Sequence, residues 1–148
     1  MIKERTLDFV YNDGGRKNAG YKGITGDCVT RAIAIISNKQ YKEVYTALNL
    51  LGKSEYIRKS NARTGVYRRT YDKYLKSLGY TWTPTMKIGS GCKVHLNANE
   101  LPKGRLIVMV SRHVTAVIDG IIHDIYNCSR NGRRCVYGYY TKDIVNSI

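Results

Sequence analysis

A glycine turn that leads through a cysteine into an apolar segment constrains this chain more than any other feature. The stretch Thr25–Ile36 reads TGDCVTRAIAII. Its apolar residues recur at the spacing of a helix with one buried face, at Val29, Ala32, Ile33 and Ile36. The sequence therefore predicts a helix that begins near Asp27, with Asp27 as its N-cap and Cys28 in its first turn.

A cysteine at the start of a helix has chemical consequences. The free N–H groups and the positive end of the helix dipole favour the thiolate over the thiol. The same N–H groups can stabilise an oxyanion that forms during acyl transfer. Cys28 is therefore a candidate nucleophile, provided that a histidine reaches it. The alternative is a small apolar residue in the core, because free cysteines are often buried.

The balance of charge points to an acidic partner. The chain of 148 residues, which we expect to form one domain over 1–148, holds 25 Lys and Arg against 11 Asp and Glu, a formal net charge of +14. Such a balance favours contact with nucleic acid, an anionic surface or an acidic protein. The candidate polyanion-binding residues are Arg58, Lys59, Arg63, Arg68, Arg69, Arg133 and Arg134.

The N-terminus and the cysteines favour a cytoplasmic protein. The first residues are charged and lead into no apolar segment, which argues against a signal peptide, and no run is long enough to span a membrane. Without a secretion signal, four cysteines favour reduced thiols. Zinc is a competing interpretation, because Cys92-x-x-His95 and the pair Cys128 and Cys135 offer ligands, although the second pair is widely spaced. We expect no metal and no other cofactor.

The remaining segments predict an α+β order. An edge strand is expected within 1–10 and a glycine-rich basic loop over 12–26. Three helices are expected: one over 27–38, a second that begins with Asn38 as its cap and stops at Gly52, and a third over 68–78. Strands are expected at 80–83, 105–110, 113–118, 121–126 and 136–140, with irregular chain over 84–103. The expected architecture is a helical part over about 27–79 followed by an antiparallel sheet over about 104–141.

One hairpin fixes a register that brings a histidine and a carboxylate together. Asp119-Gly120 is a typical two-residue hairpin turn, so Ile118 should pair with Ile121. Counting outward from this turn places four side chains on one sheet face: His113, Thr115, Asp124 and Tyr126. Asp124 is then a diagonal neighbour of His113, while His123 points to the opposite face. A cysteine nucleophile needs such a histidine to take its proton and a carboxylate to orient the ring.

These residues resemble a known group of enzymes. Gly26-Asp27-Cys28 followed by Arg31-Ala32-Ile33-Ala34, with His113 and Asp124 late in the chain, resembles the papain-like cysteine peptidase superfamily. The nucleophile helix is similar to that of ovarian-tumour-type deubiquitinases and of small phage and bacterial papain-like proteins. The resemblance implies a single papain-like α+β domain with a triad of Cys28, His113 and Asp124. It also implies thiol-dependent hydrolysis of a peptide or isopeptide bond in a protein or peptide substrate.

The donor that would complete the oxyanion site is not assigned by the resemblance. Papain-type enzymes carry a glutamine about six residues before the cysteine, where this chain has Lys22, and the ovarian-tumour type carries an aspartate where this chain has Thr25. Lys22, Asn18 and Thr25 are therefore the candidate donors beside the Cys28 N–H. The alternative function is a non-catalytic module on the same fold that binds nucleic acid or protein through its basic surface.

Overall fold

The computed structural model describes residues 8–21, 26–55, 62, 65–87 and 89–142. This part of the chain contains three helices and six strands, with bounds β1 Asp8–Tyr11, α1 Cys28–Ser37, α2 Tyr41–Glu55, α3 Arg68–Ser77, β2 Tyr80–Pro84, β3 Arg105–Val110, β4 His113–Ile118, β5 Ile121–Asp124 and β6 Val136–Lys142. The fold class is α+β, as the sequence predicts.

The strands form one mixed sheet in the order β1-β5-β4-β3-β6-β2. β4 pairs antiparallel with β3 and β5, and β6 pairs antiparallel with β3 and β2. β1 runs parallel to β5, with Asp8 opposite Ile121, so the prediction of a purely antiparallel sheet is wrong at this edge. The physical reason is the connection: all three helices lie between β1 and β5, and so long a crossover allows parallel pairing.

The hairpin of β4 and β5 has the predicted turn and a shorter ladder than predicted. Asp119 and Gly120 both have positive φ, 48° and 80°, as the tight turn requires, and Ile118 pairs with Ile121. β5 ends at Asp124 instead of residue 126. The backbone N–H of Ile125 donates to Asp124 Oδ1 at 2.7 Å, so it is not available to extend the ladder.

Two predicted helix boundaries are wrong. Asn38 adopts a left-handed conformation, with φ of 58°, and ends α1, so α2 begins only at Tyr41. Gly52 lies inside α2 instead of stopping it. Gly52 is buried, and the packing of the helix outweighs the intrinsic cost of a glycine, about 1 kcal/mol relative to alanine.

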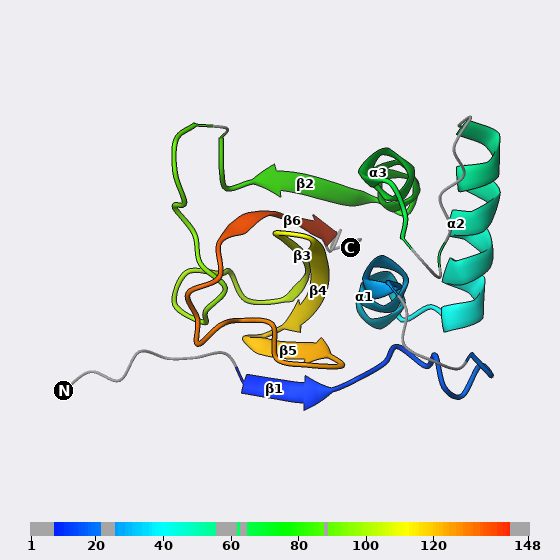
Figure 1. The fold of residues 1–148 in the computed structure, drawn as a ribbon, viewed down its shortest axis with the longest axis horizontal. Coiled ribbons are helices and arrows are strands. Elements are labelled where there is room, and N and C mark those ends of the chain that lie inside the picture. Colours follow the sequence, from blue (N-terminus) through cyan, green and yellow to red (C-terminus); the bar gives the residue numbers. More distant parts are fainter. Residues whose placement is uncertain (1–7, 22–25, 56–61, 63–64, 88, 143–148) are drawn as a thin grey trace, which may run out of the picture.

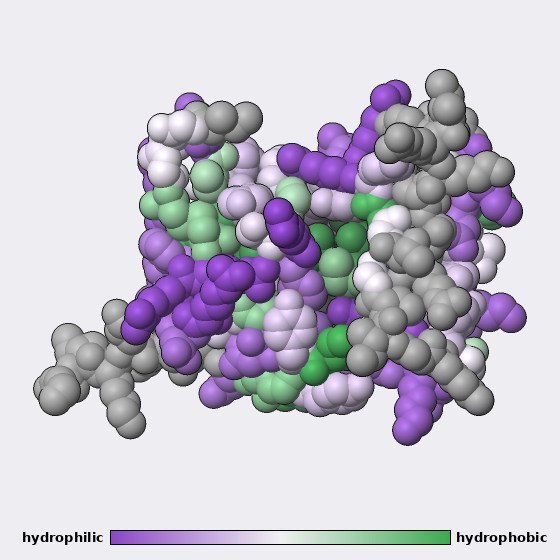
Figure 2. Space-filling view, viewed as in Figure 1, coloured by the Kyte–Doolittle hydropathy of each residue, from purple (hydrophilic) through white to green (hydrophobic). Residues whose placement is uncertain are grey.

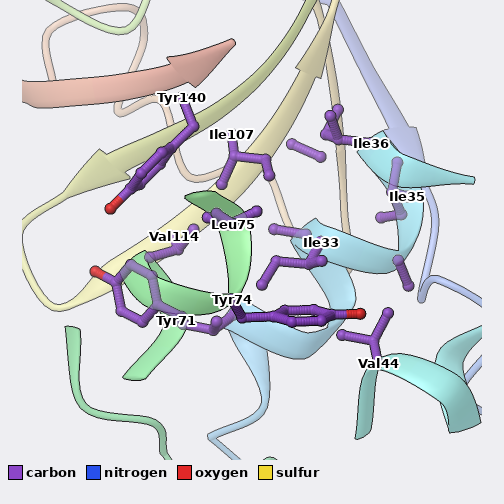
Figure 3. Packing of buried hydrophobic residues seen from close by; sticks show 14 of the residues in the cluster. Ile33, Ile35, Ile36, Val44, Tyr71, Tyr74, Leu75, Ile107, Val114 and Tyr140 are labelled. Atoms are coloured by element: carbon purple, nitrogen blue, oxygen red, sulfur yellow. The ribbon is translucent and has the colours of Figure 1, made fainter. Parts of the chain in front are cut away.

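The main hydrophobic core lies between the sheet and the helices. α1 packs against the sheet, with α2 and α3 beside it (Figure 1). Figure 3 shows the side chains that meet there, with Ile33 of α1 close to Leu75 of α3 and Val114 of β4 pointing toward Tyr71. Almost all of α1 is buried, from Val29 to Ile36, which fixes the position of its first turn relative to β4.

A second hydrophobic cluster covers the opposite face of the sheet. Leu106, Val108 and Val117 pack there against residues from the irregular segment and the loop before β6, including Leu96 and Cys128. The alternation of side chains along β4 places His113 and Thr115 on this face. Across the described residues, no helix is both long and apolar enough to cross a membrane.

A disulfide joins Cys92 to Cys135, with 5.8 Å between the Cα atoms, while Cys28 and Cys128 are free. The expectation of four reduced thiols is therefore wrong for this pair. The bond also removes the predicted zinc ligand set, because two of its members are joined to each other. The ring of His95 instead lies 3.1 Å from a carboxylate oxygen of Glu100.

Candidate active site

Cys28 and His113 come from different layers and meet at one end of the sheet. Cys28 is the first residue of α1, and His113 is the first residue of β4. The two side chains line the same cleft, and the side chain of His113 and the backbone of Val114 both lower the pKa of the Cys28 thiol. The juxtaposition follows from the packing of α1 along β4 in the main core.

Asp124 holds the other side of the histidine ring. Its Oδ2 lies 2.7 Å from His113 Nε2, and the hydroxyl of Thr115 donates to the same oxygen at 2.7 Å. The contact between His113 and Asp124 that the hairpin register predicts is therefore present. Because Nε2 faces a carboxylate, it carries a proton, and Nδ1 is the ring nitrogen left for Cys28.

The pKa shifts of the three groups favour a charged triad. Burial by itself would raise the pKa of the Cys28 thiol, but the hydrogen bond and positive charge of His113 lower it below its ordinary value. Burial also opposes the charging of His113, yet hydrogen bonds to Asp124, Cys128 and Cys28 raise its pKa to about 12. For Asp124, the bond to His113 outweighs burial and lowers the pKa. The shifts of all three groups therefore act in the same direction, toward the charged form of each.

Arg31 connects the helix of the nucleophile to the carboxylate of the triad. Its side chain is buried, forms an ion pair with Asp27 and lies 3.6 Å from Asp124 Oδ1. Asp27 is itself buried and accepts a hydrogen bond from Tyr41 at 2.6 Å. Asp27 occupies the N-cap position of α1, as predicted, but its carboxylate is engaged with these groups and makes no cap hydrogen bond.

Cys128 also lies beside His113 and Asp124, and sequence reasoning did not identify it. It is fully buried, and its Sγ lies 3.9 Å from Asp124 Oδ2. His113, Asp124 and Cys128 offer a nitrogen, an oxygen and a sulfur within 4.8 Å of one another, which are ligand types that zinc accepts. Arg31 already places a positive charge beside the Asp124 carboxylate, which disfavours a divalent cation there and favours proton transfer.

A cleft of about 700 Å³ opens onto Cys28 and His113. Its lining combines apolar side chains such as Val66 and Met109 with aromatic rings such as Tyr126, whose centroid lies 5.2 Å from that of His113. Figure 2 shows a depression on this view of the molecule, with apolar surface at its floor and hydrophilic side chains beside it. A substrate therefore has room to approach the thiol.

The candidate oxyanion donors are not assembled in the described part of the chain. Lys22 and Thr25 lie outside the described residues, and Asn18 is exposed and does not line the cleft. The prediction for Asn18 is therefore wrong. The backbone N–H of Ala19 donates to the oxygen of Gly15 and that of Gly20 donates to the oxygen of Lys17, and these turns leave Asn18 at the surface. The backbone N–H of Cys28 itself, at the start of α1, remains a candidate oxyanion donor.

The candidate polyanion-binding residues fall into three groups. Arg58, Lys59 and Arg63 lie outside the described residues. Arg68, Arg69 and Arg133 are exposed. Arg134 is buried, and its guanidinium donates to the backbone oxygens of Ser111 at 2.5 Å and of Cys128 at 3.3 Å. The prediction for Arg134 is therefore wrong, since it supports the loops that carry the site instead of facing a ligand.

The sequence held a signal for Arg31 and none for Cys128. Asp27 and Arg31 are four residues apart on a helix, which is the spacing of an ion pair. The position of Cys128 depends on an irregular loop with no periodic pattern.

Comparisons of the chain with family models, with curated proteins and with solved structures found no match.

Proposed function

We propose that this protein is a thiol-dependent hydrolase of papain-like type that acts on a peptide or isopeptide bond. The observation that carries the proposal is the continuous chain of contacts from Cys28 through His113 to Asp124 at an open cleft. The three residues match the order of residues in the family that the sequence resembles. No cofactor is needed for this chemistry.

Each member of the triad has a defined role in the proposed reaction. The Cys28 thiolate attacks the carbonyl carbon of the substrate, and the oxyanion is held by backbone N–H groups at the start of α1. His113 then gives its proton to the departing amine as the carbon–nitrogen bond breaks, leaving a thioester on Cys28. Water, deprotonated by His113, hydrolyses the thioester and restores the thiolate. Asp124 keeps the ring oriented and stabilises the imidazolium.

The first experiment measures the rate of iodoacetamide labelling at Cys28 between about pH 5 and pH 10, read by mass spectrometry. We expect fast labelling well below pH 8 in the wild type, because the His113 imidazolium stabilises the thiolate. In His113→Ala the burial of the thiol is opposed only by the Val114 backbone and the charge of Arg31, so the labelling curve should move to higher pH. His123→Ala is the matched control, because His123 lies on the other face of the hairpin.

Slow labelling of Cys28 in the wild type, unchanged in His113→Ala, would mean that no ion pair forms and would overturn the proposal. A positive result is followed by incubation with peptide aldehydes, which form a hemithioacetal with a nucleophilic cysteine. Loss of this adduct in His113→Ala, and its retention in His123→Ala, is the result expected of an active dyad.

A second candidate is a non-catalytic module that binds nucleic acid. The net charge of +14 favours it, because neutralised phosphates release counterions and increase affinity. Binding of this kind weakens steeply with salt and does not depend on the thiol. A salt titration of oligonucleotide binding with the wild type and Cys28→Ala separates the two functions, since only the enzyme requires Cys28.

A further inference from the structure

Two arginines line the cleft without an acidic partner. Arg68 comes from the first position of α3, and Arg112 comes from the turn before β4, directly next to His113. Neither forms an ion pair or a side-chain hydrogen bond with the part of the chain that the structure describes. Among the described residues that line the cleft, none is an Asp or a Glu. Arg68 acts electrostatically on Asp72, outside this lining, so the positive charge of the cleft wall is only partly compensated.

Arg68 is held in a geometry suited to anion binding. Its guanidinium lies over the indole ring of Trp82, at 4.6 Å from the ring centroid. Stacking occupies the face of a guanidinium and leaves the N–H groups at its edge free to donate. The positive charge of Arg68 and the negative charge of the Cys28 thiolate both act on the hydroxyl of Tyr71 in the cleft, so Arg68 lies within electrostatic reach of the reacting thiol.

The backbone of Arg112 adopts an unfavourable conformation. Its φ is 56°, in the left-handed region that glycine or asparagine adopts at lower cost. Its side chain is exposed and lines the cleft beside His113. Arg31, the third arginine of the lining, differs from both, because its charge is matched by Asp27 and Asp124.

The geometry points to an anion-binding subsite, formed by Arg68 and Arg112, that selects a polypeptide segment with an Asp or Glu side chain next to the bond that Cys28 attacks. The inference rests on the proposed function and names its substrate class. A polypeptide fits better than nucleic acid, because apolar side chains such as Val66 and Met109 line the same cleft as the two arginines. A nucleic acid chain is bound instead by a continuous track of cations and stacking rings.

The test compares two alkylating reagents that differ in charge. Iodoacetate carries a carboxylate and iodoacetamide does not, so the ratio of their rates at Cys28 reports the attraction of an anion to the cleft. In Arg68→Gln and in Arg112→Gln we expect the iodoacetate rate to fall about three- to tenfold while the iodoacetamide rate is retained. High salt should lower the ratio in the wild type toward that of the variants. Lys103→Gln is the charge-matched control, because Lys103 is exposed, lies outside the cleft and precedes β3, whose first residue Arg105 pairs with Ile118 at the end of β4 away from His113.

A second measurement does not depend on the reactivity of the thiol. Fluorescence anisotropy of Cys28→Ala is recorded with a labelled peptide that contains Glu and with the same peptide containing Gln. The Glu peptide should bind more tightly, and this preference should be lost when Arg68→Gln or Arg112→Gln is added. If Cys28 reacts with neither reagent, the proposed hydrolase fails, and the peptide preference alone decides whether the subsite exists.

Two outcomes would overturn the subsite. One is an unchanged ratio of alkylation rates in both arginine variants together with equal binding of the two peptides. The other is that a short oligothymidylate binds more tightly than the Glu peptide and displaces it, and that Arg68→Gln loses binding of both the oligothymidylate and the peptide. This result would assign the arginines to nucleic acid binding.

Discussion

The substitution Asp124→Asn tests whether the carboxylate controls the reactivity of Cys28. Asp124 Oδ2 accepts from both His113 Nε2 and the Thr115 hydroxyl at 2.7 Å. An amide of the same shape removes the negative charge, and an NH₂ group at the Oδ2 position would face two donors. The imidazolium of His113 then loses its principal partner, although the fold keeps the volume of the side chain.

The size of the effect follows from the lost contact. A hydrogen bond to a charged group contributes about 1.5–3 kcal/mol, and roughly 1.4 kcal/mol corresponds to one pKa unit. The pKa of His113, raised to about 12 in the folded protein, should therefore fall by about 1–2 units in Asp124→Asn. Without the carboxylate the His113 ring also turns more freely away from Cys28, so the thiolate loses its partner, the pKa of Cys28 rises and its labelling curve moves to higher pH. At pH 7 we expect labelling about tenfold slower.

The assay is the pH profile of iodoacetamide labelling at Cys28, with thermal unfolding to confirm that the variant is folded. Asp8→Asn is the matched control, because Asp8 lies on the exposed edge strand β1. A folded Asp124→Asn protein with the wild-type labelling profile would remove Asp124 from the mechanism and refute the reasoning.

Three further predictions concern stability, each measured by urea unfolding. Arg31→Met removes one cation from the buried carboxylates of Asp27 and Asp124, which keep Arg16 and His113, and should lower the free energy of unfolding by about 3 kcal/mol; a loss below about 1 kcal/mol would contradict a structural ion pair. Replacing Cys92 and Cys135 by Ser opens a loop with a sequence separation of 43 and should cost about 4 kcal/mol by loop-closure entropy, without slowing the labelling of Cys28; equal stability of the two forms would count against the disulfide. Gly138→Ala places a methyl group against the indole ring of Trp82 and the backbone oxygen of Thr83 and should destabilise by about 1–3 kcal/mol; an unchanged free energy of unfolding would contradict this close packing.

The parts of the fold set by local patterns could be predicted from the sequence. The periodicity of α1 and the turn at Asp119 and Gly120 place Cys28 at a helix start and His113 beside Asp124 without knowledge of the tertiary structure. These features depend on neighbours within a few residues or on the fixed geometry of a two-residue turn.

The parts that failed depend on long-range packing. The parallel pairing of β1 with β5 and the disulfide join segments that no local pattern relates. Asp27 has the residue type and position of an N-cap, but the buried Arg31 and Tyr41 take its carboxylate. Arg134 looks like any surface arginine in a basic run, and only the tertiary structure reveals that its guanidinium supports the backbone of two loops. The roles of Cys28, His113 and Asp124 in a reaction stay a prediction until the thiol is tested.

The placement of the triad across the two faces of the sheet links chemistry to the completeness of folding. Cys28 is positioned by the helical cluster, while Asp124 and Cys128 are positioned with the cluster on the opposite face. A chain in which only one of these clusters has formed holds the nucleophile without its base, or the base without its nucleophile. The enhanced reactivity that we propose for Cys28 therefore requires both clusters, and the rate of Cys28 labelling below pH 8 reports whether both are formed.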